Sequence, residues 1–243
     1  MSPFLLSNTK FKPLKSGLIN KKGVNIFGNK ISRWKGGSTQ KQSILTLNFS
    51  KTELPYKALV IHIVKTYRRS CLVALLKYSS GSYSYSLSPY GFQPGFWTKA
   101  LFKPINFSVA YNLGYTLLLK YLTPNTIIFN VEYTLLKGGV YCRAAGTFAE
   151  ILVIDEFSNL VLLQLPTGSK LWVDAYCVAT LGRASNIFNQ SSVIGKAGLN
   201  RDINLRPKVR GVAMNAVDHP HGGRSKTNSP ELTPWGKIAK KNR

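Results

Sequence analysis

Residues 148–173 read FAEILVIDEFSNLVLLQLPTGSKLWV, and this stretch decides the fold class. Three short apolar runs lie within it, at 148–154, 160–165 and 170–173. Asp, Ser and Asn at 155–159 and Pro-Thr-Gly-Ser at 166–169 separate the runs with residues that favour turns. Short strands at such spacing predict a small β barrel rather than a helical bundle.

Similar runs lie outside this stretch. Residues 58–64 (ALVIHIV) are β-branched and short, residues 71–78 (CLVALLKY) form a second apolar run, and residues 82–87 (SYSYSL) alternate as a half-exposed strand does. A further strand is predicted at 127–132. The apolar and aromatic segment 96–122 has no clear periodicity and is left open as an insertion or a helix. The chain is therefore predicted to be mainly β, with two tandem small barrels.

The charge of the chain is far from balanced. Among 243 residues, 33 are Lys or Arg and 9 are Asp or Glu, which gives a net charge of +24. A compact chain with this charge repels itself, and a bound polyanion such as RNA relieves the repulsion. Because 44% of the residues are hydrophobic and 12% are aromatic, the chain can still bury a core. The composition excludes an acidic cytosolic enzyme, a disulfide scaffold and a collagen-like chain.

Cysteine usage and targeting signals narrow the class further. Cys71, Cys142 and Cys177 have no paired spacing, so buried, reduced thiols of an intracellular protein are expected. No uninterrupted apolar stretch reaches the length of about 18 residues that indicates a transmembrane helix. The first residues lack the charged start of a signal peptide and the Arg-rich pattern of a transit peptide. We expect no membrane insertion, and either synthesis where the chain works or a weak targeting segment.

Both ends of the chain are basic and poorly patterned. Strand patterning disappears near residue 184, and Gly, Asn, Lys and Arg dominate from there to the end. Lys and Arg neutralise phosphates, Gly allows close approach of backbones, Asn215 suits base or sugar edges, and Trp235 offers a stacking face. Such a segment is expected to order on RNA rather than to fold alone.

Two motifs in this C-terminal stretch are specific. Residues 210–223 read RGVAMNAVDHPHGG and residues 233–236 read TPWG. They resemble the signature of the large-subunit ribosomal protein two family, and KGG at 137–139 with RAAGT at 143–147 agrees with it. The chain departs from the family pattern at Ala216, where the family usually has Pro, and over the whole segment from Phe96 to Leu122.

The resemblance implies an oligonucleotide-binding-type barrel followed by an SH3-like barrel. The implied parts are a basic N-terminal arm (1–55), the first barrel (56–122), the SH3-like barrel (123–183) and an extended, basic, RNA-penetrating tail (184–243). The implied function is that of a structural constituent of the large ribosomal subunit, without enzymatic activity and without a cofactor or metal. The implied partners are large-subunit ribosomal RNA, neighbouring ribosomal proteins and the small subunit across an intersubunit contact. The tail would help to organise the region of the peptidyl-transferase centre during translation.

The residues predicted to bind RNA are cationic, polar or aromatic side chains of the second barrel and the tail. Basic side chains suit phosphates, and Arg and Trp also stack on bases. The predicted set is Arg143, Arg183, Lys196, Arg201, Arg206, Lys208, Arg210, Asn215, His219, His221, Arg224, Trp235 and Lys237.

Asp218, His219 and His221 allow another interpretation. A metal-dependent hydrolase would use them as ligands, but zinc sites need three or four protein ligands, and the third histidine, His62, lies in an apolar strand. General acid–base catalysis by His219 is a further idea. We favour hydrogen bonding of both histidines to RNA, so His219→Ala is expected to perturb assembly or subunit joining without loss of a chemical step. An RNA-binding regulator outside the ribosome is the last alternative.

Several aromatic residues carry expectations for the core. Trp97 and Trp172 lie among apolar neighbours and are expected to be buried. His62 is expected to be a hydrogen-bonded core or barrel-rim residue. Tyr83 and Tyr85 are expected to form a half-buried strand face rather than a platform for stacked bases.

Composition also bears on location. Lys, Asn, Ile, Leu, Phe, Tyr and Ser are plentiful, as in proteins from AT-rich genomes, which indicates an organelle. The divergence at Ala216 and in the N-terminal half favours the mitochondrion and its ribosome, with the plastid as the alternative.

Overall fold

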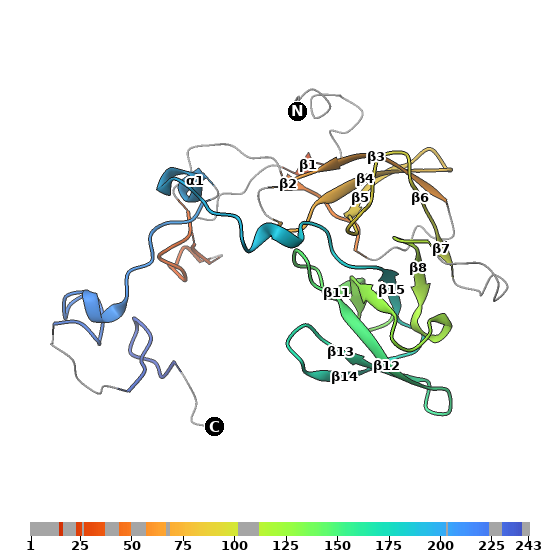
Figure 1. The fold of residues 1–243 in the computed structure, drawn as a ribbon. Coiled ribbons are helices and arrows are strands. Elements are labelled where there is room, and N and C mark those ends of the chain that lie inside the picture. Colours follow the sequence, from red (N-terminus) through yellow and green to blue (C-terminus); the bar gives the residue numbers. More distant parts are fainter. Residues whose placement is uncertain are drawn as a thin grey trace. The chain divides into compact units, whose positions relative to one another are not determined.

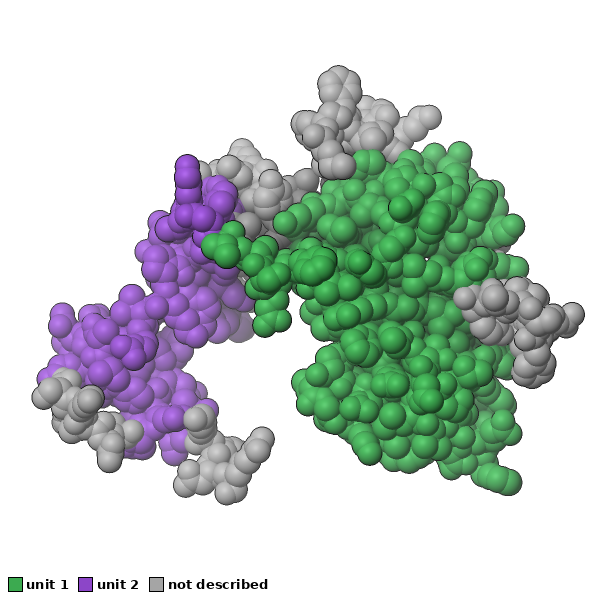
Figure 2. Space-filling view, viewed as in Figure 1, with its two compact units in different colours: residues 1–18, 41–193 green, residues 19–40, 194–243 purple. Residues whose placement is uncertain are grey.

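A computed structural model describes residues 15–16, 23–25, 27–36, 44–49, 57–66, 69–101, 112–202, 204–223 and 230–239. The chain divides into two compact units (Figure 2). Unit 1 comprises residues 1–18 and 41–193, and unit 2 comprises residues 19–40 and 194–243. Unit 1 is built from β sheets (Figure 1), which confirms the mainly β fold class.

The first sheet of unit 1 contains four antiparallel strands in the order β5-β4-β3-β6. They are β3 (Ala58–Val64), β4 (Val73–Tyr78), β5 (Tyr83–Leu87) and β6 (Trp97–Thr98). The predicted strands at 58–64, 71–78 and 82–87 are confirmed to within two residues. One side of the sheet buries Val60 and Leu76, and the other buries Leu75 and Tyr85. This sheet lies within the range predicted for the first barrel, 56–122.

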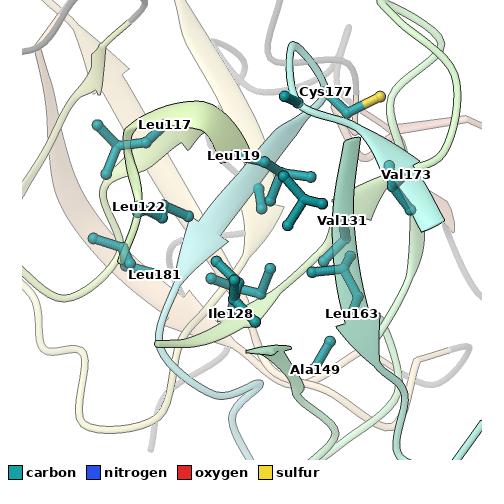
Figure 3. Packing of buried hydrophobic residues seen from close by; sticks show 14 residues of the cluster. Leu117, Leu119, Leu122, Ile128, Val131, Ala149, Leu163, Val173, Cys177 and Leu181 are labelled. Atoms are coloured by element: carbon teal, nitrogen blue, oxygen red, sulfur yellow. The ribbon is translucent and has the colours of Figure 1, made fainter. Parts of the chain in front are cut away.

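The second sheet has the strand order β14-β13-β12-β9-β15-β8-β7. Its strands are β7 (Ala100–Leu101), β8 (Thr116–Leu118), β9 (Ile127–Phe129), β12 (Ala149–Asp155), β13 (Leu160–Gln164), β14 (Lys170–Asp174) and β15 (Val178–Leu181). Side chains from these strands converge on one core (Figure 3). Ile128, Ile151, Val161 and Leu163 are fully buried there. The three strands predicted within 148–173 are confirmed.

The strand predicted at 127–132 is interrupted. Asn130 has a positive φ of 50°, which ends β9 and starts β10 (Val131–Glu132). The short strand β10 pairs with β11 (Gly139–Tyr141) instead of continuing the large sheet. Asn tolerates this left-handed conformation better than the β-branched residues around it.

The segment 96–122 is partly resolved as strand. Residues 102–111 lie outside the described residues, but β6, β7, β8 and the 3₁₀ turn η3 (Leu119–Tyr121) account for much of the rest. β7 pairs in parallel with β8, and β8 pairs with β15. Hydrogen bonding therefore places 100–101 and 116–118 in the larger sheet, although the predicted boundary between the barrels lies after residue 122.

Two tryptophans contradict the expectation of a core position. Trp97 is 51% exposed and Trp172 is 48% exposed. Side chains alternate across a strand, and Thr98 and Val173 are the buried neighbours, so both indoles point outward. For Trp172 the apolar neighbours in sequence were the wrong guide, because Leu171 and Val173 lie on the opposite face of the strand and pack in the core.

The expectation for His62 is confirmed in its position, since the residue is partly buried in β3, but not in its hydrogen bonding. Its Nδ1 atom is buried without a hydrogen-bond partner in the described part of the chain. The register of β3 against β4 shifts between Val60 and His62, as at a β-bulge. The expectation of a strand face for the tyrosines is confirmed, since Tyr85 is 2% exposed and Tyr83 packs beside it against Val73 and Leu75.

The three cysteines are free thiols; Cys71 and Cys177 are buried as expected, whereas Cys142 is only partly buried. Burial raises the pKa of Cys71 and raises the pKa of both Cys142 and Cys177 to about 12. They therefore remain protonated and unreactive at neutral pH.

Unit 2 contains little regular structure. Its elements are α1 (Ala197–Asp202), the 3₁₀ turn η5 (Gly211–Ala213) and isolated bridges that join Val24 to Lys30, Lys35 to Leu205 and Leu232 to Ile238. Within the described ranges, none of the helices has the length and apolar character needed to cross a membrane. In unit 1, β1 (Lys15–Ser16) pairs with β2 (Ile44–Leu45), and the 3₁₀ turn η4 (Ile187–Asn189) follows β15.

Candidate nucleic-acid interface

Three loops of unit 1 are bound together by side-chain hydrogen bonds. Ser70 Oγ accepts a hydrogen bond from Ala145 N at 3.1 Å, and Asn186 Nδ2 donates to the carbonyl oxygen of Ser70 at 2.6 Å. Ser185 Oγ accepts from Leu72 N at 3.1 Å and lies 3.2 Å from Cys71 Sγ. Because each bond joins segments far apart in sequence, the loops at 69–72, 142–147 and 183–186 have fixed positions.

Two guanidinium groups lie on one aromatic ring beside these loops. The centre of the Arg69 guanidinium is 5.2 Å from the Phe49 ring centroid, and that of Arg143 is 4.9 Å from it. Both distances fit cation–π contacts. We call Arg69 and Arg143 the arginine pair.

The charges of the arginine pair are not balanced by acid. Burial, and then repulsion from Arg69, lowers the pKa of Arg143. Among the described residues, no carboxylate forms an ion pair with either guanidinium. Two half-buried cations near each other create a positive potential that an anion can relieve, and guanidinium groups bind phosphates in a bidentate manner. The geometry is therefore that of an anion site.

Arg183, the other predicted residue of this unit, lies on the loop that follows β15. Its Nε donates to the carbonyl oxygen of Gly146 at 2.7 Å, and its guanidinium centre is 5.1 Å from the Phe148 ring centroid. Part of its hydrogen-bonding capacity thus fixes the loop at 142–147, which carries Arg143.

In unit 2, residues of the N-terminal arm pack against residues of the tail. Arg206 N donates to the carbonyl oxygen of Trp34 at 2.8 Å, and Gly36 N donates to that of Asn204 at 2.9 Å. Lys208 Nζ lies 5.1 Å from the Trp34 ring centroid. Trp34 therefore lies on a turn and orients a predicted RNA-binding lysine.

Most predicted cations of the tail face outward. The predicted cations whose side chains are exposed in unit 2 are Lys196, Arg201, Arg206, Lys208, Arg210 and Lys237. Arg201 lies in the last turn of α1, and Arg210 directly precedes η5. Arg224 lies outside the described residues. The described cations of this set are therefore open to solvent.

Residues 219–223, which read HPHGG, form a closed turn around the His219 ring. His219 Nδ1 accepts a hydrogen bond from His221 N at 3.1 Å, and Gly222 N donates to the carbonyl oxygen of His219 at 2.9 Å. Arg33 Nη1 donates to the carbonyl oxygen of Asp218 at 3.2 Å. Burial, together with the charges of His221 and Arg33, lowers the pKa of His219. The ring is therefore neutral at pH 7 and holds the turn in place.

The neighbouring predicted residues are presented by this turn and the next one. Asn215 is exposed, and its carbonyl oxygen accepts from Asp218 N at 3.0 Å. His221 Nε2 accepts from Leu232 N at 3.1 Å, which connects the HPHGG turn to the segment at 230–239. Trp235 is 57% exposed within the turn that Thr233 and Lys237 close. Among the described residues, no group of three His, Cys, Asp or Glu side chains gathers as metal ligands.

Gly222 offers a test of this turn. A Cβ at Gly222 would overlap the carbonyl oxygens of Met214 and Asn215. We expect Gly222→Ala to destabilise the turn by about 2 kcal/mol, the usual cost of overpacking, and to increase amide hydrogen exchange at residues 211–223. The control is Gly198→Ala on α1, where a Cβ meets nothing within 4 Å. Equal exchange in the two variants would contradict the closed turn.

The sequence analysis missed Phe49, Arg69 and Arg33. Arg69 belongs to the basic doublet at 68–69 directly before the second predicted strand, which was a usable signal. Phe49 and Arg33 gave no such signal, because their roles depend on contacts with Arg143 and Asp218, far away in sequence.

Comparisons with known proteins place the chain in a family. The family model described as Ribosomal Proteins L2, RNA binding N-terminal domain matches residues 12–98, and the model described as Ribosomal Proteins L2, C-terminal domain matches residues 112–236. The large ribosomal subunit protein uL2 of Parvibaculum lavamentivorans is 36% identical over 236 residues, which cover 94% of this chain and 81% of the relative. That of Mycoplasma pneumoniae is 38% identical over 242 residues, covering 96% and 82%. That of Rhodospirillum rubrum is 36% identical over 236 residues, covering 94% and 80%.

Proposed function

This chain belongs to the ribosomal protein L2 family, and from that premise we propose how it serves the large ribosomal subunit. It is a structural constituent of that subunit and binds large-subunit ribosomal RNA. It is not an enzyme, since the family is a structural, RNA-binding one, and this sets aside the metal-dependent hydrolase.

The observation that carries the proposed mode of binding is the arginine pair on Phe49. Each guanidinium has its position fixed by an aromatic ring, and neither has a carboxylate partner in the described part of the chain. Phosphodiester groups of ribosomal RNA supply the missing negative charge. The pair therefore takes a backbone phosphate, and specificity comes from the shape of the folded RNA around it.

The remaining contacts come from the outward-facing side chains of both units. The proposed set keeps Arg143 and Arg183 in unit 1 and adds Arg69. In unit 2 it comprises Lys196, Arg201, Arg206, Lys208, Arg210, Asn215, His219, His221, Arg224, Trp235 and Lys237. His219 acts mainly by holding the turn that presents Asn215 and His221, because its own ring is only 7% exposed.

Location and finer partners belong to the same proposal. The amino-acid composition, which is typical of proteins from AT-rich genomes, and the departure from the family pattern at Ala216 support a mitochondrial ribosome, with a plastid ribosome as the alternative. The tail approaches the peptidyl-transferase region, and the protein takes part in the contact with the small subunit and supports subunit association. These finer placements rest on the family resemblance and on the surplus of positive charge at both ends of the chain.

Sedimentation tests this function against a regulator outside the ribosome. We expect the chain to travel with the large subunit through a sucrose gradient at low and moderate salt. A chain that stays at the top of the gradient, bound to other RNAs, would instead identify the regulator.

Salt dependence tests phosphate-led binding separately. Each neutralised phosphate releases counterions, so log K for the RNA is expected to fall with log salt by about 0.7 to 0.9 per phosphate contacted. Filter binding to a large-subunit RNA fragment over a series of salt concentrations measures the slope. A flat response would show that phosphates contribute little.

A further inference from the structure

One face of the large sheet differs in charge from the rest of the molecule. The strands β12, β13 and β14 lie side by side (Figure 1). Their outward side chains form three cross-strand rows. The rows are Glu150-Gln164-Lys170, Val153-Leu162-Trp172 and Asp155-Leu160-Asp174. We call these nine residues the outer face.

The middle row is apolar and open to solvent. Val153 is 49% exposed and Trp172 is 48% exposed, with the partly buried Leu162 between them. The opposite side chains of the same strands, Val161 and Val173 among them, are buried in the core. The sheet thus has a complete core on one side and a second apolar row on the other.

Acidic residues border this apolar row. Residues 149–176 contain four acidic side chains, Glu150, Asp155, Glu156 and Asp174, and one basic side chain, Lys170, which gives −3 in a chain of +24. They make up four of the nine acidic residues of the whole protein. A surface of this sign repels phosphates, so it is unsuited to the RNA that the rest of the chain attracts.

The carboxylates of this region have no basic partner among the described residues. Hydrogen bonds from Ser158 Oγ and from the amides of Phe157 and Ser158 lower the pKa of Asp155. Asp174 Oδ1 accepts a hydrogen bond from Tyr176 N at 2.9 Å. Within the described ranges, none of the four carboxylates forms an ion pair with Lys or Arg. The ammonium group of Lys120 contacts the Tyr176 ring instead, with Nζ 5.5 Å from the ring centroid.

We propose that the outer face docks a basic segment of a neighbouring protein of the large subunit, with Trp172 as its apolar anchor. Charge complementarity selects this occupant, because a cationic segment relieves the three unpaired carboxylates of the outer face and that of Glu156 beside it in sequence, and its apolar side chains cover the middle row. A half-exposed tryptophan is the residue type that most often dominates such interfaces. The identity of the particle rests on the proposed function, whereas the chemistry of the face does not.

Photo-crosslinking in intact large subunits tests this docking site. Trp172→p-benzoylphenylalanine places a crosslinker on the outer face, and the same change at Trp97 places one on the other sheet as a matched control. After irradiation and ribonuclease digestion, mass spectrometry identifies the partner. We expect Trp172 to give a crosslink to a Lys- and Arg-rich peptide of another ribosomal protein. Adding Glu150→Lys and Glu156→Lys is expected to lower that yield by about tenfold, with the Trp97 pattern unchanged.

Each other outcome overturns the docking site in a distinct way. A crosslink from Trp172 to RNA, to a basic segment of this same chain, or to no molecule would remove the proposed partner. If the yield of the Trp172 crosslink does not change with Glu150→Lys and Glu156→Lys, charge complementarity does not hold the partner. As long as the variant chain is recovered in the large subunit, these outcomes leave the proposed function standing. Absence of the unsubstituted chain from that subunit would overturn the proposed function instead.

Discussion

Replacing both Arg69 and Arg143 with Gln lowers the affinity of the chain for large-subunit ribosomal RNA by about 100-fold at moderate salt. Two charge-assisted contacts to phosphate are lost, and about 2.8 kcal/mol corresponds to this factor. The slope of log K against log salt becomes shallower by about 1.4 to 1.8, since two cations no longer release counterions. Filter binding at several salt concentrations measures both quantities.

The matched control removes the same charge from another surface. Lys77 and Lys170 are exposed on the two sheets of unit 1, and the double change Lys77→Gln with Lys170→Gln also lowers the net charge by two. We expect this control to retain affinity to within a few fold. In the free chain, relief of the Arg69–Arg143 repulsion offsets the loss of the two cation–π contacts with Phe49, so we expect the arginine variant to keep the unfolding midpoint of the unsubstituted chain. Equal losses of affinity in both variants would show that the arginine pair contributes to RNA binding only through its net charge.

The second large effect is on stability. Glu132 is 2% exposed, and its carboxylate accepts hydrogen bonds from Gly138 N at 3.0 Å and Val178 N at 3.3 Å. We expect Glu132→Ala to lower the free energy of unfolding by about 3 kcal/mol, because two buried amides lose their acceptor. Urea unfolding followed by fluorescence measures this loss. The control Glu150→Gln, on the outer face, is expected to change stability by less than about 0.5 kcal/mol.

Glu132 also predicts a dependence of stability on pH. Burial raises the pKa of Glu132, and hydrogen bonds from the backbone of Val178, Gly138 and Leu136 oppose this in part. The folded protein thus binds the proton more tightly than the unfolded chain. The stabilisation is complete below the unfolded pKa and is lost as pH rises through the folded pKa. The advantage of the unsubstituted protein over Glu132→Gln should therefore narrow with rising pH, and a constant or widening gap would contradict this assignment.

Local patterning was enough to predict many of the strands. The runs at 58–64 and 160–165 appear as β3 and β13 because their apolar residues match strand length and the turns beside them are strong. β15 was missed, since Val178–Leu181 is only four residues long and is buried through its pairing with β8 and β9. Trp97 and Trp172 were misplaced because apolar neighbours were weighed without the alternation of the strand.

The residues of the candidate site were likewise predicted only in part from the sequence. Residues of the tail were predicted from composition and motif, because phosphate contact requires mainly charge and reach. The arginine pair was only half predicted, since Phe49, Arg69 and Arg143 come from three segments that tertiary structure brings together. The packing of Trp34 against Lys208 likewise depends on contacts between the arm and the tail that have no periodic signal in either segment.

An electron-microscopy map of the native large subunit, viewed at the arginine pair, tests the central claim most directly. The claim is that the unbalanced cations of this chain are neutralised by ribosomal RNA. We expect a phosphodiester group within about 3 Å of the guanidinium groups of both Arg69 and Arg143. Water alone around the pair, or a carboxylate from a neighbouring protein bound to it, would contradict the claim.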